Sequence, residues 1–110
     1  MKSIAIAILN WNGEHLLKRF LKDVVDNSPE AAVYLIDNAS TDESVDYVKK
    51  DHPTVSIILL DENYGYAGGY NRGLVALKED IICLLNNDVM VNAGWLPPVL
   101  DHFEKHPKTG

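Results

Sequence analysis

Four short apolar runs in this chain each end in a carboxylate or an amide. The runs cover residues 4–9, 33–36, 55–60 and 81–85, and they are followed by Asn10, Asp37, Asp61 and Asn86. If the runs are parallel strands, these polar groups lie along one edge of one sheet. In open α/β sheets that edge is where ligands bind. Oxygen-rich groups gathered there suit a sugar nucleotide and a hard metal ion.

Strand-like and helix-like stretches alternate along the chain. The first run is continuously apolar, which favours a strand buried on both faces. Residues 14–25 have the apolar spacing of an amphipathic helix, and residues 40–50 begin with the hydroxyl and acidic groups that favour a helix start. Further helices are expected over 67–78 and 94–106. The β-α-β-α-β-α-β-α order predicts an α/β fold with a parallel sheet and right-handed crossovers.

Composition and charge exclude several classes of protein. The 110 residues suffice for one small domain, and 10 Lys+Arg against 16 Asp+Glu give a formal charge of -6. A basic footprint for nucleic acid is therefore absent. No apolar stretch approaches the roughly 20 residues that span a bilayer. Cys83 is the only cysteine, so no internal disulfide is possible and a reducing cytoplasm is expected.

The segments after the first two strands offer groups that could bind a nucleoside. Asn10 and Asn12 can read the edge of a base, and Trp11 can stack on a ring. A capped turn with a buried tryptophan explains the same residues equally well. Asp37 can accept a hydrogen bond from a base N–H, whereas Ser40–Thr41 is explained as a helix cap.

Residues 63–73, NYGYAGGYNRG, form the most unusual stretch. Its glycines permit positive φ and close backbone approach, and exposed amides at a helix N-terminus could face a diphosphate. Arg72 could add a charge-assisted contact or point to solvent, while helix–sheet packing is the favoured explanation for Gly73. The stretch is neither a GxxxxGK[ST] loop nor a GxGxxG fingerprint after the first strand, which argues against an ATPase and against a classical dinucleotide-binding protein. Three tyrosines either line a pocket or pack under the loop: Tyr64, Tyr66 and Tyr70.

Asn86, Asn87 and Asp88 follow the fourth strand. One carboxylate with diphosphate oxygens is a usual way to hold Mg²⁺ or Mn²⁺. A turn or a helix cap is the alternative, but Asp88 shares its expected edge with Asp37. The pair His102 and His106 has helical spacing without an HExxH pattern, so solvent-exposed histidines are favoured over a zinc site.

Taken in order, the segments at 9–13, 36–42, 63–73 and 85–89 resemble those of family 2 glycosyltransferases, most nearly the rhamnosyltransferase-like branch. The resemblance covers nearly the whole chain. It implies a GT-A fold, a Rossmann-like three-layer sandwich with a mainly parallel sheet. It also implies a UDP- or dTDP-linked sugar donor, Mg²⁺ or Mn²⁺, and hexosyl transfer with inversion to a saccharide or lipid-linked acceptor. Polysaccharide or cell-envelope glycan synthesis is the expected setting.

The family's motifs map onto particular residues of this chain. Its DXD metal motif aligns with residues 86–88, where Asn86 replaces the first Asp and Asp88 is left to bind the metal. The common Arg-Asn pair reads Tyr70-Asn71, so an arginine role at position 70 is lost. The residues that the resemblance implies in nucleotide-sugar binding are Asn10, Trp11, Asn12, Asp37, Asn38, Asn63, Gly68, Asn71 and Asn87.

In the family, the catalytic base lies well beyond the metal motif. Residues 1–110 therefore resemble the donor-binding part alone, and the base and the acceptor-binding half are expected beyond Gly110. We expect this piece to bind nucleotide weakly, to transfer no sugar, and to self-associate through an uncovered strand edge. The parent enzyme is expected in the cytoplasm, and peripheral attachment to the inner face of the membrane stays open.

Three rival classes stay open at this point. A sugar-nucleotide pyrophosphorylase-like domain binds a similar ligand, but it places a glycine-rich loop after the first strand, which residues 10–13 match poorly. A receiver-like signalling domain needs an acidic pair where this chain has Asn10 and Asn12, although Asp61 could be its phosphoacceptor. A non-catalytic nucleotide-binding module is the third alternative.

Overall fold

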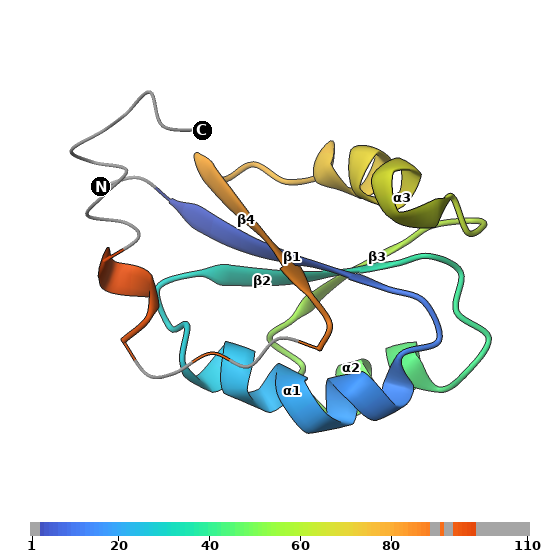
Figure 1. The fold of residues 1–110 in the computed structure, drawn as a ribbon, viewed down its shortest axis with the longest axis horizontal. Helices are drawn as coiled ribbons and strands as arrows, with labels where there is room; N and C mark the ends of the chain where they lie inside the picture. The colour runs from blue at the N-terminus through green and yellow to red at the C-terminus, as the bar shows by residue number, and fades with distance from the viewer. Residues whose placement is uncertain (1–2, 89–90, 92–93, 99–110) are drawn as a thin grey trace.

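The computed structural model describes residues 3–88, 91 and 94–98. Strands and helices alternate as the apolar runs predict (Figure 1). The elements are β1 (Ile4–Asn10), α1 (Glu14–Asp26), β2 (Ala32–Asp37), α2 (Ser44–Asp51), β3 (Ser56–Leu59), α3 (Gly65–Leu74) and β4 (Ile81–Asn86). The helix predicted over 94–106 lies largely outside the described residues, and so do His102 and His106.

The four strands form one parallel sheet in the order β3-β2-β1-β4. Asn10 at the end of β1 pairs in register with Asp37 of β2, and Leu9 pairs with Asn86 of β4. The carboxyl ends of the strands therefore meet at one edge, which confirms the predicted arrangement. Each predicted strand boundary lies within one residue of the observed one.

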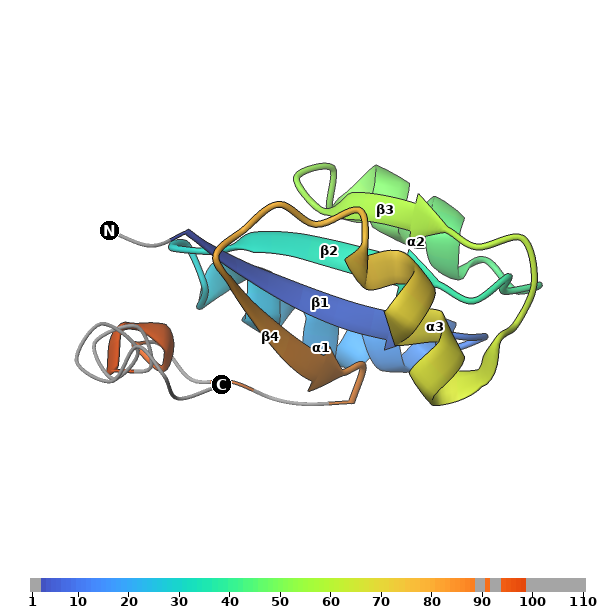
Figure 2. The ribbon, with the colours of Figure 1, turned by 90° about the horizontal axis from the view of Figure 1, so that it is seen from above.

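Helices cover both faces of the sheet, as expected of a three-layer sandwich. α1 and α2 lie on one face and α3 lies on the other (Figures 1 and 2). The side chains from Ile4 to Ile8 are no more than 2% exposed, which explains why the first run has no polar alternation. Leu17 and Leu21 of α1 pack in the larger of two core clusters. Each such buried leucine stabilises the fold by roughly 1.5–3 kcal/mol.

The glycines of α3 let the helix approach the sheet closely. A Cβ added at Gly73 would lie 2.5 Å from Cδ1 of Ile36, which is completely buried. A Cβ at Gly69 would lie 2.8 Å from Cδ1 of Leu9. The packing role predicted for Gly73 is therefore confirmed.

Two helices begin at residues other than those predicted. α2 begins at Ser44 rather than at residue 40, because the amide and hydroxyl of Ser40 bond back to Asp37. α3 spans 65–74 rather than 67–78. It begins early because Oδ1 of Asn63 accepts a hydrogen bond from the amide of Gly65, which takes a φ of +77°.

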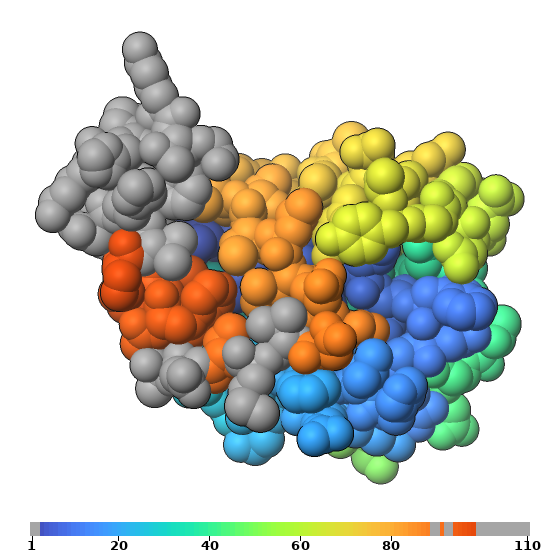
Figure 3. All heavy atoms as spheres, in the orientation of Figure 1, coloured from blue at the N-terminus to red at the C-terminus, as the bar shows by residue number. Residues whose placement is uncertain are grey.

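The β4 strand carries apolar side chains at the surface. Ile82 is 37% exposed and Leu84 is 46% exposed. Figure 3 shows the atoms of β4 at the surface beside α3. Self-association through this strand stays a prediction. No helix among the described residues is long and apolar enough to cross a membrane.

The close approach of α3 leads to a stability prediction for Gly73→Ala. The added methyl group meets the buried Ile36 side chain, and overpacking of this kind costs about 1–3 kcal/mol, partly offset by the better helix propensity of alanine. We expect a net loss of about 1 kcal/mol or more in urea denaturation at neutral pH.

Gly68→Ala provides the matched control within the same helix. Its added Cβ would lie 3.1 Å from Cβ of Tyr64 and 3.7 Å from Nη1 of Arg72, near the surface rather than against the core. We expect its free energy of unfolding to change by less than about 1 kcal/mol. Equal losses in the two variants would contradict the packing argument.

Candidate functional site

Buried side chains connect the carboxyl ends of β1, β2 and β4. Asn10 and Asp37 are 1% and 2% exposed. Nδ2 of Asn10 donates to Oδ1 of Asp37 at 3.0 Å, and Nδ2 of Asn87 donates to Oδ1 of Asn10 at 3.1 Å. Three predicted site residues from three strand ends are thus brought together in one hydrogen-bonded network.

Ser40 is the residue of this network that the sequence did not reveal. Its hydroxyl donates to Oδ1 of Asp37 at 2.7 Å, and its amide donates to Oδ2 of Asp37 at 2.9 Å. The same hydroxyl accepts a hydrogen bond from the amide of Asn12 at 2.9 Å. The helix-cap role predicted for Ser40 is therefore wrong. An Asp at a strand end with Ser three residues later was the available signal, because Asp side chains bond nearby backbone in turns.

The carboxylate of Asp37 is held by hydrogen bonds rather than by a cation. The two ion pairs found among the described residues, Lys18–Glu14 and Lys22–Asp26, both lie on α1. Burial of an unpaired carboxylate is costly unless donors surround it. Oδ2 of Asp37 accepts one hydrogen bond, from the Ser40 amide, so it retains the capacity to accept another. The predicted contact with a base N–H stays a prediction.

Asn12 connects the loops that follow β1 and β2. It adopts a φ of +49°, and its Oδ1 accepts hydrogen bonds from the amides of Thr41 at 2.7 Å and Asp42 at 3.2 Å. Gly13 follows, and a Cβ there would lie 2.5 Å from Oδ1 of Asn10. The absent side chain leaves room for the Asn10–Asn87 hydrogen bond.

Asp42 supports the starts of two helices at once. Its Oδ2 accepts from the amide of Glu14, the first residue of α1, at 3.1 Å, and its Oδ1 accepts from the amide of Ser44, the first residue of α2, at 2.9 Å. Burial acts to raise the pKa of Asp42, but the hydrogen bonds from the hydroxyl and amide of Ser44 and from Glu14 outweigh it and hold the pKa below its ordinary value. Negative charge between two helix N-termini is favourable.

Asn38 and Asn63 hold the loop that leads into α3. Asn38 is 2% exposed; its Nδ2 donates to the carbonyl of Gly65 at 2.9 Å, and its Oδ1 accepts from the amide of Tyr64 at 3.0 Å. Asn63 accepts from the amide of Gly65 at 2.8 Å. Both predicted nucleotide-binding residues thus shape the backbone of the glycine-rich stretch.

Arg72 lies on the ring of Tyr64 rather than apart from the protein. Its guanidinium carbon is 3.6 Å from the ring centroid, a cation–π arrangement. The Tyr64 hydroxyl donates to Asp61, and this hydrogen bond raises the pKa of Tyr64. Of the other two tyrosines, Tyr66 is 63% exposed, whereas Tyr70 is buried between α3 and the sheet.

Other predicted site residues lie at the surface of the protein. Trp11 is 54% exposed, so the alternative of a buried tryptophan is wrong. Asn71, Asn86 and Asp88 are exposed, and Gly68 is half-buried. The predicted set therefore divides into an inner layer that is bonded to the protein itself, in which Oδ2 of Asp37 can accept one more hydrogen bond, and an outer layer that is open to a ligand.

A metal held by protein side chains alone is not indicated. Within the described part of the chain, no three His, Cys, Asp or Glu residues gather closely enough to hold an ion. Asp88 offers one exposed carboxylate. This donor set fits a divalent cation only where diphosphate oxygens and water complete the coordination shell, as the sequence predicted.

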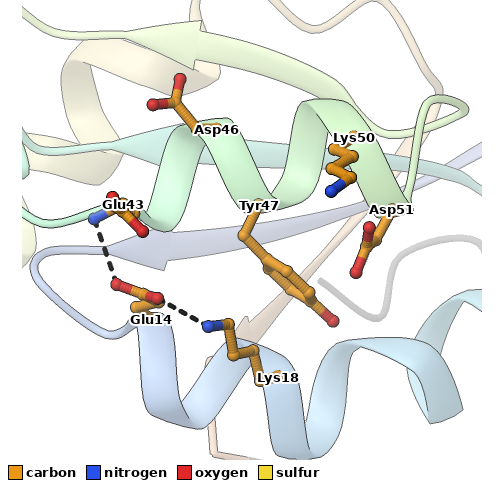
Figure 4. A pocket seen from close by; sticks show the side chains of 7 residues that line it. All are labelled: Glu14, Lys18, Glu43, Asp46, Tyr47, Lys50 and Asp51. Carbon is orange, nitrogen blue, oxygen red and sulfur yellow. Dashed lines mark hydrogen bonds and ion pairs between the residues drawn. The ribbon is translucent and has the colours of Figure 1, made fainter.

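A hollow of about 540 Å³ lies between α1 and α2 (Figure 4). Charged side chains and one tyrosine line it: Glu14, Lys18, Glu43, Asp46, Tyr47, Lys50 and Asp51. Internal contacts partly satisfy these groups, since Glu14 bonds both Lys18 and the amide of Glu43. None of the predicted ligand residues lines this hollow, so the strand-end edge is the candidate site.

Comparison with known proteins identifies a family that matches this chain and several proteins of similar sequence. A family described as "Glycosyl transferase family 2" matches residues 3–110. Polypeptide N-acetylgalactosaminyltransferase 13 from Homo sapiens is 31% identical over 115 residues, covering 97% of this chain and 20% of that protein. Protein RfbJ from Shigella flexneri is 25% identical over 104 residues, covering 94% of this chain and 78% of that protein. This chain spans about a fifth of the length of the N-acetylgalactosaminyltransferases that it matches.

Two solved structures share the fold. TarS 1–349 from S. aureus, in complex with UDP-GlcNAc, has a TM-score of 0.83 at 19% identity over 96% of this chain and 32% of that chain. The mannosyltransferase PcManGT from Pyrobaculum calidifontis, in complex with GDP-Man and Mn²⁺, has a TM-score of 0.74 at 20% identity over 84% of this chain and 29% of that chain. At such identities the likeness shows the fold alone, and it confirms the predicted GT-A fold.

The position of Asp42 leads to a prediction about stability and pH. Asp42→Asn removes the charge and leaves one acceptor oxygen where two are used. We expect the variant to lose about 1 kcal/mol of stability at pH 7, the usual size of a helix-cap effect. Urea denaturation measures the loss, with Glu30→Gln in an exposed loop as the control.

The pH dependence of this loss has a definite sign. Folding lowers the pKa of Asp42, so its stabilisation is present above the unfolded pKa of about 4 and is lost as the pH falls through the folded value. The gap between wild type and Asp42→Asn should therefore begin to shrink as the pH falls below about 4 and go on shrinking towards the folded pKa. A difference in stability of equal size at pH 7 and pH 3 would count against the role of the Asp42 charge at the starts of α1 and α2.

Proposed function

Because this chain belongs to glycosyl transferase family 2, we propose that its strand-end edge binds the nucleotide-diphospho-sugar donor of an inverting, metal-dependent glycosyltransferase. The observation that carries the proposal is the hydrogen-bonded network of Asn87, Asn10, Asp37 and Ser40. The network holds three strand ends in fixed positions, while Trp11 and other polar groups stay exposed beside it. A rigid inner layer under exposed ligand-facing groups is the arrangement that precise binding requires.

The nucleoside is assigned to the ends of β1 and β2. Trp11 provides an exposed ring on which a base can stack, and Oδ2 of Asp37 retains acceptor capacity for a base N–H. Asn10 acts beneath them by holding Asp37 in place. UDP-GlcNAc and GDP-Man are named as ligands of the two structural neighbours, which supports a nucleotide-sugar donor here.

The diphosphate is assigned to the side of the edge where β4 ends. Asp88 would hold Mg²⁺ or Mn²⁺ together with diphosphate oxygens and water. When bound, such an ion offsets the negative charge that builds on the departing diphosphate. PcManGT, which shares this fold, is in complex with Mn²⁺ as well as GDP-Man, and this supports a divalent cation here.

Transfer to an acceptor needs a second set of residues. Inversion requires a base that takes the proton of the acceptor hydroxyl while its oxygen attacks the anomeric carbon from the face opposite the diphosphate. We assign residues 1–110 to the donor-binding part and leave the base to residues outside this chain. Cytoplasmic synthesis of a polysaccharide or cell-envelope glycan is the setting proposed, and it rests on the family resemblance alone.

Nucleotide titration tests the donor site directly. We expect isothermal titration of the chain with UDP or dTDP to show weak binding that MnCl₂ tightens several-fold, the order expected for one shared metal contact. Asp88→Asn should abolish the tightening by Mn²⁺ without weakening metal-free binding, because the substitution removes a negative charge that repels the diphosphate. Asp51→Asn, at the far end of α2, is the matched control. No heat with any nucleotide from a folded sample would overturn the proposal.

Trp11 gives a separate test of nucleoside binding. Its side chain is 54% exposed, so Trp11→Ala should leave the free energy of unfolding nearly unchanged. Loss of stacking on a base should weaken uridine or thymidine binding about tenfold, since such stacking contributes roughly 1–3 kcal/mol. Val75→Ala removes an apolar side chain that is 85% exposed and should not affect binding. Equal nucleoside affinity in Trp11→Ala and wild type would remove Trp11 from the site.

A further inference from the structure

The hydroxyl of Tyr70 reaches from α3 to the junction of β1 and β4. The residue is 4% exposed. Its hydroxyl accepts a hydrogen bond from the amide of Leu9 on β1 at 3.3 Å and donates one to the carbonyl of Leu85 on β4 at 3.0 Å. A single side chain thus connects a helix with two neighbouring strands at the edge that holds the candidate site.

The amide of Leu9 and the carbonyl of Leu85 face each other between the neighbouring strands β1 and β4. The carbonyl of Asn10 accepts from the β2 side, through the amide of Asn38, whereas the carbonyl of Ser3 accepts from Ile81 of β4. Backbone groups alternate along a strand, so Leu9, like Ser3, is directed towards β4. Leu9 is in register with Asn86, and the slanted bonds of a parallel pair direct its amide to the carbonyl before that residue, which belongs to Leu85.

The hydroxyl therefore bonds both backbone groups of the last rung of the β1–β4 ladder, near its carboxyl end. The glycines at 69 and 73 make this possible, because they bring α3 close to the strands. The ring of Tyr66 packs edge-on against that of Tyr70, with 5.1 Å between centroids. Burial raises the pKa of Tyr70, so the phenol stays protonated at neutral pH and can donate and accept at once.

A second contact holds the same segment two residues further on. Nδ2 of Asn87 donates to Oδ1 of the buried Asn10. Leu85 and Asn87 are thus tied to β1 or to α3 on either side of Asn86, and Asp88 comes next in the chain. The carboxylate assigned to the cation is exposed, but the backbone that carries it is held from two directions.

We propose that Tyr70 is a positioning residue for the cation site: its hydroxyl fixes the end of β4 and thereby the place of Asp88. The inference rests on the proposed function, because it concerns the cation assigned to Asp88. Nothing in it requires Tyr70 to touch the ligand. It predicts that the hydroxyl affects metal-dependent binding selectively, whereas a merely structural hydroxyl would affect all ligands alike.

The test compares Tyr70→Phe with Tyr66→Phe, two changes that each remove one phenol hydroxyl from the same helix. Each variant of the chain is titrated with uridine, with UDP, and with UDP in the presence of MnCl₂. For Tyr70→Phe we expect the uridine Kd to stay within about twofold of wild type, while the Mn²⁺-dependent gain in UDP affinity falls by about half or more. That is the order expected for one buried hydrogen-bonding group. Tyr66→Phe, whose residue is 63% exposed, should match wild type throughout.

The possible results separate the two proposals. A wild-type chain without any Mn²⁺-dependent gain overturns both the proposed function and this inference. A wild-type gain that Tyr70→Phe retains in full overturns the inference alone, and so does an equal weakening of uridine, UDP and UDP with MnCl₂.

A measurement on the wild-type chain needs no variant and covers the case in which Tyr70→Phe fails to fold. Coupling between two sites is reciprocal, so a cation at Asp88 should stabilise the Leu9–Leu85 rung that Tyr70 contacts. Hydrogen exchange of the Leu9 amide should be slower with UDP and MgCl₂ than with UDP alone, whereas exchange within α2 should not change. Equal exchange at Leu9 under both conditions would refute the positioning role.

Discussion

The requirement that a buried carboxylate be surrounded by donors governs the candidate site. Asp37 is 2% exposed at the end of β2, and such a group is costly to bury unless hydrogen bonds satisfy it. Asn10 on the neighbouring strand provides one donor, and Ser40 provides its amide and hydroxyl. Holding Ser40 against its own strand delays the start of α2 to Ser44. That delay places Asp42 where it can bond the first amides of α1 and α2 together.

The fold was largely predictable because burial leaves a direct mark on sequence. Apolar runs predicted four strands, and the continuous first run matches a strand that is covered on both faces. The packing role of Gly73 was equally visible, since no larger residue fits beside Ile36. Helix starts were less predictable. Asn63 begins α3 early and Ser40 delays α2, and both effects depend on which of several possible partners a short polar side chain selects.

The sequence predicted the edge that holds the site. It did not predict which residues of that edge are buried and bonded to the protein and which are exposed to a ligand. Asn10, Asp37 and Asn38 resemble ligand-binding residues in the sequence, yet all three are at most 2% exposed and are bonded to the protein itself. Apart from Ser40, which follows Asp37 by three residues, the partners cited here lie 26 to 77 residues away in the chain, and no local pattern reveals such distant pairs. Trp11 and Asp88, by contrast, are exposed and open to a ligand.

Charge explains why a donor site of this design would depend on a cation. A nucleoside diphosphate brings negative charge to an edge that already carries Asp37, Asp42 and Asp88, on a chain whose formal charge is -6. The nearby guanidinium of Arg72 lies on the ring of Tyr64, and the exposed end of β4 is the place where a divalent ion can bridge carboxylate and diphosphate. The buried carboxylate cannot move away from the ligand, because its hydrogen bonds hold the strand ends together. Under the proposed function, the cation therefore serves binding before it serves the chemical step, since it offsets repulsion that the fold itself creates.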